Sequence, residues 1–210
     1  MPLKVLLADD HAIVRQGLRV LLEKEGFTVV GECADGREAA NACETLHPDV
    51  AVLDLSMPNL NGMDAAREIT RHNSRTKVVL LTMHTEDNLI LESLRAGVTG
   101  YVLKTRAFDE LTQAIRAVSR GEMHLTPGIS RTIVQAFLSK DELPARAISD
   151  RERQVLQLVA EGKTTKEVAA LLGISVKTAE SHRSNLMEKL DIHDTAGLVR
   201  YAIKNGIIQP

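Results

Sequence analysis

The sequence predicts an α/β domain built on a parallel sheet of five strands, followed by an all-α domain of four helices. Up to about residue 120, five short apolar runs alternate with amphipathic stretches at helical spacing. From Ile148 onward the strand pattern is absent and only helical patterns remain. The chain has 210 residues, of which 44% are hydrophobic and 26% charged, and this size and composition suit a globular protein of two small domains.

The five expected strands are apolar almost throughout. They are LKVLLA (3–8), TVVGEC (28–33), DVAVLDL (49–55), KVVLLT (77–82) and GYVLK (100–104). Strands of this kind need cover on both faces, and each is followed by a helical pattern. We therefore expect a parallel sheet with helices on both sides.

Glycine and proline mark where the intervening helices stop. The first helix carries an apolar stripe of Val14, Leu18, Leu21 and Leu22 and ends at Gly26. The other four are expected at about 36–47, from about 61 after the breaker MPNLNG, at 86–96, and from about 108 to 121.

The character of the chain changes after residue 121. We expect a first domain over residues 1–121, a partly helical linker over 122–147 and a second domain over 148–210. Within the linker, ISRTIVQAFL (129–138) has the pattern of one helix, and SKDELPARA is typical of an exposed connection. The second domain opens with Ser149 as N-cap and Glu152 three residues later, which is the pattern of a capping box. Its remaining helices are expected in TTKEVAALLG, SVKTAESHRSNLMEKLD and TAGLVRYAIKNG.

Cysteine use and the N-terminus indicate a soluble cytoplasmic protein. Cys33 and Cys43 are the only cysteines and form no CxxC pair, which argues against a disulfide framework or a zinc site. The N-terminal apolar run ends at Asp9, too early for a signal peptide or a membrane span. Residues 148–210 carry nine Lys and Arg against eight Asp and Glu, so charge alone does not indicate nucleic acid binding.

Two adjacent aspartates follow the first strand in LLADDH. In a parallel sheet the carboxyl ends of the strands meet at one edge, where ligands bind. An isolated acidic pair at such a position is most often a solvated turn. Here, however, further polar side chains stand at the ends of other strands, and together they form an oxygen-rich site that suits Mg²⁺. The strand-end residues are Asp9, Asp10, Asp54, Thr82 and Lys104.

On these residues and their spacing, positions 1–120 resemble the receiver domain of bacterial two-component response regulators, which has a (βα)5 flavodoxin-like fold. The resemblance implies that Asp54 accepts a phosphoryl group from a partner histidine kinase. It also implies that Asp10, Asp54 and the backbone carbonyl of Ser56 bind Mg²⁺ directly, with Asp9 acting through water. Thr82 and Lys104 would then hold the phosphoryl oxygens.

The same resemblance makes Tyr101 the switch aromatic that packs inward as Thr82 moves. Two positions depart from the common family pattern. Lys104 is followed by Thr105, where proline is frequent, and Met83 is larger than the usual residue beside Thr82. Taken singly, Lys104 could be an ordinary surface lysine and Tyr101 an ordinary buried ring.

The second domain contains the pattern of a helix-turn-helix. One helix with Val168, Ala169, Leu171 and Leu172 meets a second through a turn at Gly173 and Ile174. The second helix, capped by Ser175, has an apolar face of Val176, Ala179, Leu186 and Leu190. A packed face of this kind can hold a polar face in the DNA major groove, although any helical hairpin would share the pattern. The polar, DNA-facing candidates are Lys177, Thr178, Glu180, Ser181, Arg183 and Ser184.

Residues 148–208 resemble the LuxR-type helix-turn-helix of the NarL/FixJ subfamily. This resemblance implies a promoter-binding regulator that forms a homodimer when phosphorylated, often through its final helix. The alternatives are an aspartate-nucleophile phosphohydrolase, a nucleotide- or flavin-binding protein, and a protein-interaction output. The first would need an acid in place of Ser56, and the second a glycine-rich loop that DDHAIV lacks. Only a DNA-binding measurement distinguishes the third alternative, a protein-interaction output, from a DNA-binding regulator.

Overall fold

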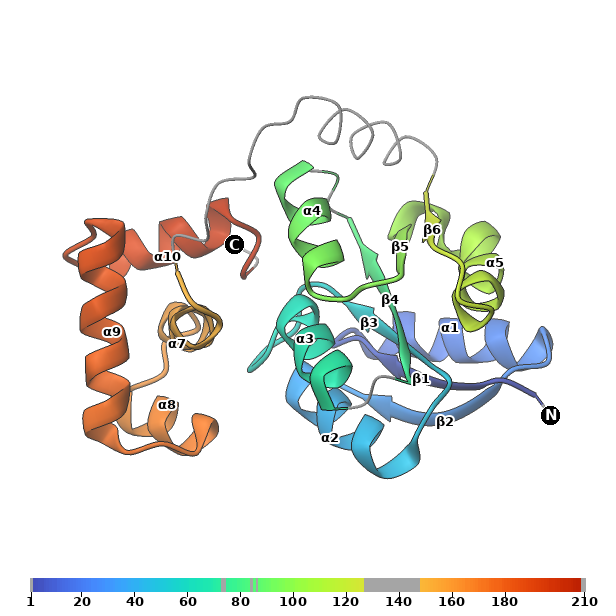
Figure 1. The fold of residues 1–210 in the computed structure, drawn as a ribbon, viewed down its shortest axis with the longest axis horizontal. Coiled ribbons are helices and arrows are strands. Elements are labelled where there is room, and N and C mark those ends of the chain that lie inside the picture. The colour runs from blue at the N-terminus through green and yellow to red at the C-terminus, as the bar shows by residue number, and fades with distance from the viewer. Residues whose placement is uncertain (1, 73–74, 84, 86, 127–147, 209–210) are drawn as a thin grey trace. The chain divides into compact units, whose positions relative to one another are not determined.

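A computed structural model describes residues 2–72, 75–83, 85, 87–126 and 148–208 (Figure 1). Contacts divide the chain into two compact units, residues 1–140 and 141–210. The predicted linker helix at 129–138 lies outside the described residues. Within those residues, no helix is both long enough and apolar enough to cross a membrane.

The first unit is a parallel sheet with the strand order β2-β1-β3-β4-β5-β6. The chain order therefore reverses between β1 and β3, and the crevice where ligands bind such sheets lies there. The predicted strands are confirmed within one or two residues. They are β1 (Lys4–Ala8), β2 (Thr28–Cys33), β3 (Val50–Asp54), β4 (Lys77–Thr82) and β5 (Gly100–Leu103).

Helices cover both faces of this sheet, as predicted (Figure 1). They are α1 (Ala12–Lys24), α2 (Gly36–Leu46), α3 (Gly62–His72), α4 (Asp87–Arg95) and α5 (Ala107–Ser119), with a short 3-10 helix η1 (Lys104–Arg106) before α5. Successive residues of β3 point to opposite faces: Val50 and Val52 pack with α1 and α5, whereas Ala51 and Leu53 pack with the other helices. This alternation produces two apolar cores, one on each side of the sheet.

A sixth strand, β6 (His124–Leu125), extends the sheet beyond the five that were expected. It pairs in parallel with β5 and lies past residue 121, where the first domain was expected to end. Thr126 follows it and is buried; its hydroxyl donates to Glu110 at 2.7 Å and accepts from the Leu103 N–H at 3.3 Å. Two strand residues are too few to give a sequence pattern, so this element escaped prediction.

The second unit consists of four helices around a core of its own. They are α7 (Asp150–Ala160), α8 (Thr165–Leu172), α9 (Val176–Leu190) and α10 (Thr195–Lys204). The predicted capping box of Ser149 and Glu152 is present, and Ser175 caps α9. Gly173 ends α8 at φ +63°, a conformation that L-residues rarely adopt, and so allows the tight turn into α9.

Three residues of the predicted apolar patterns are exposed, and one of them, Val176, was wrongly assigned to a packed face. Val14 on α1, Leu171 on α8 and Val176 on α9 are 37–42% exposed. In each case the helix packs through other residues: Leu18 and Leu22 on α1, Val168 and Ala169 on α8, and Ala179 and Leu186 on α9. Val176 stands in the first turn of α9, before the first residue of that helix that reaches the core.

Candidate functional site

The acidic pair and Asp54 meet at the carboxyl edge of the sheet, as the strand ends predicted. Asp9 and Asp10 directly follow β1, and Asp54 ends the neighbouring strand β3. Asp9 and Asp54 are 2% and 3% exposed, whereas Asp10 reaches solvent. One oxygen from each of the three carboxylates lies within 4.8 Å of the corresponding oxygens of the other two.

Lys104 provides the cation that these buried carboxylates need. Its Nζ lies 2.8 Å from Asp54 Oδ2 and 2.9 Å from Asp9 Oδ2. Burying a charge is costly unless it is paired, and one ammonium here serves two carboxylates. With Asp10 nearby, the cluster keeps an excess of negative charge.

The electrostatics of Asp54 follow from this arrangement. Burial raises the pKa of the Asp54 carboxyl to about 6; Lys104 opposes this shift and Asp9 reinforces it. Burial lowers the pKa of the Lys104 ammonium, but the contacts with Asp54 and Asp9 outweigh burial, so the pKa is raised. Asp54 is therefore ionised above about pH 6, and Lys104 stays charged beside it.

Close backbone packing fixes where Asp54 stands. A Cβ at Gly62 would lie 2.1 Å from the Asp54 carbonyl oxygen, and the Gly62 N–H donates to the Leu55 carbonyl at 2.8 Å. The segment between β3 and α3, which contains Ser56, therefore folds back tightly onto the end of the strand. Only glycine can approach this closely, which explains why the MPNLNG stretch ends in glycine.

Thr82 and Tyr101 lie on the strands beside the acidic cluster. Thr82 ends β4, the neighbour of β3, and is 1% exposed. Tyr101 is completely buried in β5, so its ring packs inward in this structure. The described residues contain no cis peptide bond, so the Lys104–Thr105 peptide is trans.

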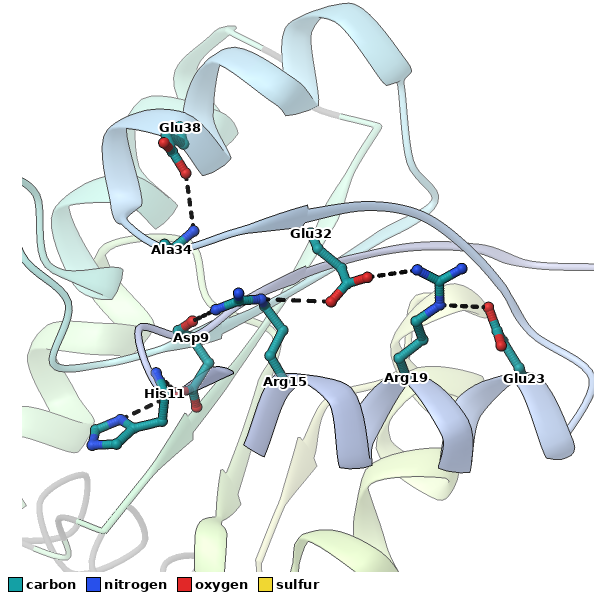
Figure 2. A network of polar contacts seen from close by, with 8 residues as sticks. All are labelled: Asp9, His11, Arg15, Arg19, Glu23, Glu32, Ala34 and Glu38. Carbon is teal, nitrogen blue, oxygen red and sulfur yellow. Dashed lines mark hydrogen bonds and ion pairs between the residues drawn. The ribbon is translucent and has the colours of Figure 1, made fainter. Parts of the chain in front are cut away.

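Two residues that sequence reasoning missed complete this edge (Figure 2). The His11 ring Nδ1 lies 2.8 Å from Asp10 Oδ1 and 3.3 Å from Asp9 Oδ1. Arg15 donates to the Asp9 backbone carbonyl at 2.5 Å and pairs with Glu32 at 3.5 Å. Their only sequence signal was their place shortly after the acidic pair, and a single histidine or arginine at such a place forms no recognisable motif.

In the second unit, α9 presents most of the proposed DNA-binding residues to solvent. Arg183 differs, because it is half-buried and donates to the Thr195 hydroxyl on α10 at 3.0 Å. Helix α9 is held from its other end by Lys189, whose Nζ lies 2.8 Å and 2.9 Å from the two oxygens of buried Glu152 on α7. The exposed members are Lys177, Thr178, Glu180, Ser181 and Ser184.

Both units match known families. Residues 5–116 match the family described as "Response regulator receiver domain", and residues 146–202 match "Bacterial regulatory proteins, luxR family". The chain belongs to the response regulators. The combination of a receiver and a luxR-type unit makes this response regulator a DNA-binding transcriptional regulator of the two-component type, and the NarL/FixJ resemblance is confirmed.

Relatives match this response regulator over nearly its full length. It is 36% identical to "Response regulator UvrY" of Escherichia coli (strain K12), covering 98% of this chain and 95% of UvrY. It is also 36% identical to "Transcriptional regulatory protein LiaR" of Bacillus subtilis (strain 168), covering 98% of this chain and 99% of LiaR.

Solved structures of RcsB share the fold of this response regulator. RcsB from Salmonella enterica serovar Typhimurium, bound to promoter P1flhDC in the presence of the phosphomimetic BeF3-, matches with 32% identity and a TM-score of 0.64. That match covers 96% of this chain and 98% of RcsB. A luxR-family response regulator from Aurantimonas sp. SI85-9A1 matches 66% of this chain and 99% of its own, with 35% identity and a TM-score of 0.62.

Proposed function

We propose that a histidine kinase phosphorylates Asp54 and that this modification switches DNA binding by the second unit. The observation that carries the proposal is the setting of Asp54. It is a buried carboxylate at the sheet edge, paired with Lys104 and adjacent to Asp9. A carboxylate so placed serves as a nucleophile when a phosphoryl donor reaches this edge.

The transfer itself uses few protein groups. One oxygen of Asp54 forms a bond to phosphorus while the phosphorus–nitrogen bond to the kinase histidine breaks, and the released imidazole takes up a proton. Lys104, 2.8 Å from Asp54, is placed to hold a phosphoryl oxygen as negative charge gathers there. Thr82 ends the next strand, β4, and we propose that its hydroxyl donates to another phosphoryl oxygen.

The donor set also fits Mg²⁺. Carboxylate oxygens are the ligands this ion prefers, and the cluster keeps an excess of negative charge beside one lysine. Asp10, Asp54 and the Ser56 carbonyl are proposed to hold the ion directly, with Asp9 acting through water. When bound, the ion screens the charge of the carboxylates and the phosphoryl oxygens.

Tyr101 and Thr82 are the proposed switch. A phosphoryl group on Asp54 would draw Thr82 and Lys104 toward it, and Tyr101 lies one strand further along the sheet. We propose that movement of these residues favours dimerisation, and that the dimer places α9 of each copy in the DNA major groove.

The partners follow from the family. RcsB is described as bound to promoter DNA and as forming dimers on DNA, and we propose the same partners for this chain, in the cytoplasm. Output through DNA binding is favoured over an aspartate-nucleophile hydrolase, because such an enzyme would need an acid where Ser56 stands.

Intact mass spectrometry tests the phosphorylation site. Incubation with a small acyl phosphate and Mg²⁺ should add one phosphoryl group that base or hydroxylamine removes, because an acyl phosphate is labile to both. Asp54→Asn should remain unmodified, whereas Asp35→Asn, which changes a carboxylate outside the cluster, should label normally. Equal labelling of wild type and Asp54→Asn would place the acceptor elsewhere.

A further inference from the structure

His11 is held against the acidic cluster by its own backbone as well as by its ring. It immediately precedes α1, and its backbone N–H donates to Asp9 Oδ1 at 2.8 Å. Its ring Nδ1 lies 2.8 Å from Asp10 Oδ1 and 3.3 Å from Asp9 Oδ1. The imidazole therefore faces both members of the acidic pair.

The loop that carries these residues is fixed from several sides (Figure 2). The Asp9 N–H donates to the Cys33 carbonyl at 3.2 Å, and Arg15 binds the Asp9 carbonyl. Arg15 pairs in turn with Glu32, which Arg19 contacts at 2.6 Å. Because the main chain on either side of the acidic pair is held, the backbone that carries the His11 ring is fixed beside the carboxylates before any ligand arrives.

The ring nitrogen belongs to the same group of potential ligands as the carboxylates. One atom each from Asp9, Asp10, His11 and Asp54 lie within 4.8 Å of one another. Two of these four, Asp9 and Asp54, are buried, so the group is not a set of freely solvated surface acids. Because His11 contributes a ring nitrogen, this group of four residues offers one nitrogen donor beside its carboxylate oxygens.

Ligand type determines which ions such a site prefers. Mg²⁺ takes oxygen ligands and keeps water, whereas Co²⁺, Ni²⁺ and Zn²⁺ bind imidazole nitrogen well. The His11 side chain is 57% exposed, so its other ring nitrogen can carry the proton and remain in water while Nδ1 binds an ion.

We infer that His11 is a fourth protein ligand when this site takes a late first-row divalent cation such as Co²⁺, Ni²⁺ or Zn²⁺, and is not a ligand for Mg²⁺. The inference rests on the proposed function in taking the acidic cluster as a cation site. Both classes of ion use the same carboxylates and therefore exclude one another. A late transition ion is thus a competitor of Mg²⁺ at the phosphoacceptor.

Calorimetric titration of the untagged full chain with Ni²⁺ and, separately, with Mg²⁺ tests this inference. In His11→Asn and His11→Gln, Ni²⁺ affinity should fall by roughly tenfold or more, because a nitrogen ligand is lost. Mg²⁺ affinity should change by no more than about twofold. His72→Asn, which changes an exposed histidine on α3, is the matched control and should bind both ions as wild type does.

A spectroscopic measurement separates a ligand from a merely structural histidine. With Co²⁺ bound, proton NMR of the wild type should show a paramagnetically shifted imidazole N–H signal that both His11 variants lack. Unchanged Ni²⁺ affinity in the variants, or a persistent shifted signal, would overturn the inference while leaving the Mg²⁺ site intact. An equal loss of Ni²⁺ and Mg²⁺ affinity would also overturn it, because His11 would then only hold the acidic pair. Failure of the wild type to bind Mg²⁺ would instead count against the proposed function.

Discussion

At the scale of single residues, the proposed function needs a buried carboxylate, and burying a carboxylate destabilises the folded state. Asp54 is 3% exposed, and burial is the largest influence on its pKa. Lys104 compensates in part, but it is shared with Asp9. The native state therefore carries an electrostatic cost at the proposed phosphoacceptor.

Replacing Asp54 by asparagine should stabilise the protein at neutral pH. The folded pKa of about 6 lies above the ordinary value of 3.8, so the folded state binds the proton more tightly and loses stability as pH rises from about 4 to 6. Without Mg²⁺, Asp54→Asn should raise the free energy of unfolding by about 1–3 kcal/mol at pH 7.5, since two pKa units correspond to roughly 3 kcal/mol and the contact with Lys104 is lost. At pH 4 the gain should nearly vanish. Urea unfolding at both pH values measures this, and a gain of equal size at each would contradict the electrostatic explanation.

Lys104→Ala should accept phosphate but fail to respond to it. The ammonium is placed to pair with phosphoryl oxygens, a charge-assisted contact present only in the modified state. Light scattering before and after phosphorylation measures the dimerisation response, with Lys24→Ala on α1 as a control that leaves the site intact. A normal response in Lys104→Ala would show that the lysine takes no part in switching.

At the scale of elements, the tightly packed loop between β3 and α3 holds the end of β3, and with it Asp54, in place. Gly62 lets the start of α3 lie against the Asp54 carbonyl, and Gly36 at the start of α2 meets the Leu60 carbonyl in the same way. Neither approach leaves space for a side chain, so both helix starts require glycine.

Gly62→Ala should destabilise the receiver and slow phosphorylation together. A Cβ there would come 2.1 Å from the Asp54 carbonyl oxygen, and the backbone must shift to relieve the clash. The expected loss is at least about 1–3 kcal/mol, the usual cost of overpacking. Gly17→Ala is the matched control, because Gly17 lies inside α1 with no atom within 4 Å of a new Cβ; it should be neutral or stabilising by up to about 1 kcal/mol. Equal effects of the two substitutions on unfolding would refute the close-packing argument.

How far the sequence predicted the molecule depended on the strength of local patterns. The five main strands, their helices and the convergence of Asp9, Asp54 and Lys104 followed from periodicity and from the rule that parallel strands end at one edge. The short strand β6 could not be predicted, because only pairing with β5 makes two residues a strand. His11 was missed because an isolated histidine after a strand carries no pattern. Val176 was misjudged because helical spacing alone does not show where along the helix contact with the core begins.

At the scale of the whole molecule, two units with separate cores are joined in one chain. The helical domain, residues 148–210, has one more Lys or Arg than Asp or Glu and is thus only weakly basic. Much of protein–DNA affinity comes from phosphate contacts, so a single copy of this unit should bind DNA modestly. Dimerisation on inverted half-sites about one helical turn apart would supply the remainder. If the first unit controls dimerisation, as proposed, it thereby controls DNA binding.

Substitutions on α9 should separate affinity from specificity. Lys177→Ala should weaken binding similarly on all sequences and reduce the salt dependence by about one unit of slope. Glu180→Ala should cost roughly 1–3 kcal/mol on the preferred site and little elsewhere, because a carboxylate can accept from cytosine N4. Arg183 is a less clean test, since it also binds Thr195. Titrations of the phosphorylated chain against matched and single-mismatch duplexes at two salt concentrations are required; an unchanged match-to-mismatch ratio in Glu180→Ala would assign that residue to the ordinary surface.

The most direct test of phosphorylation-controlled DNA binding is the DNA affinity of one preparation before and after phosphorylation of Asp54. Duplexes selected from a random pool by the phosphorylated chain provide the ligand, and Asp54→Asn, treated identically, provides the control. Phosphorylation should tighten binding by about 5-fold to 150-fold, the usual range of coupling between two sites, and Asp54→Asn should show no change. Equal affinity of the modified and unmodified wild type, or an equal gain in Asp54→Asn, would contradict the central claim that phosphate on Asp54 switches DNA binding.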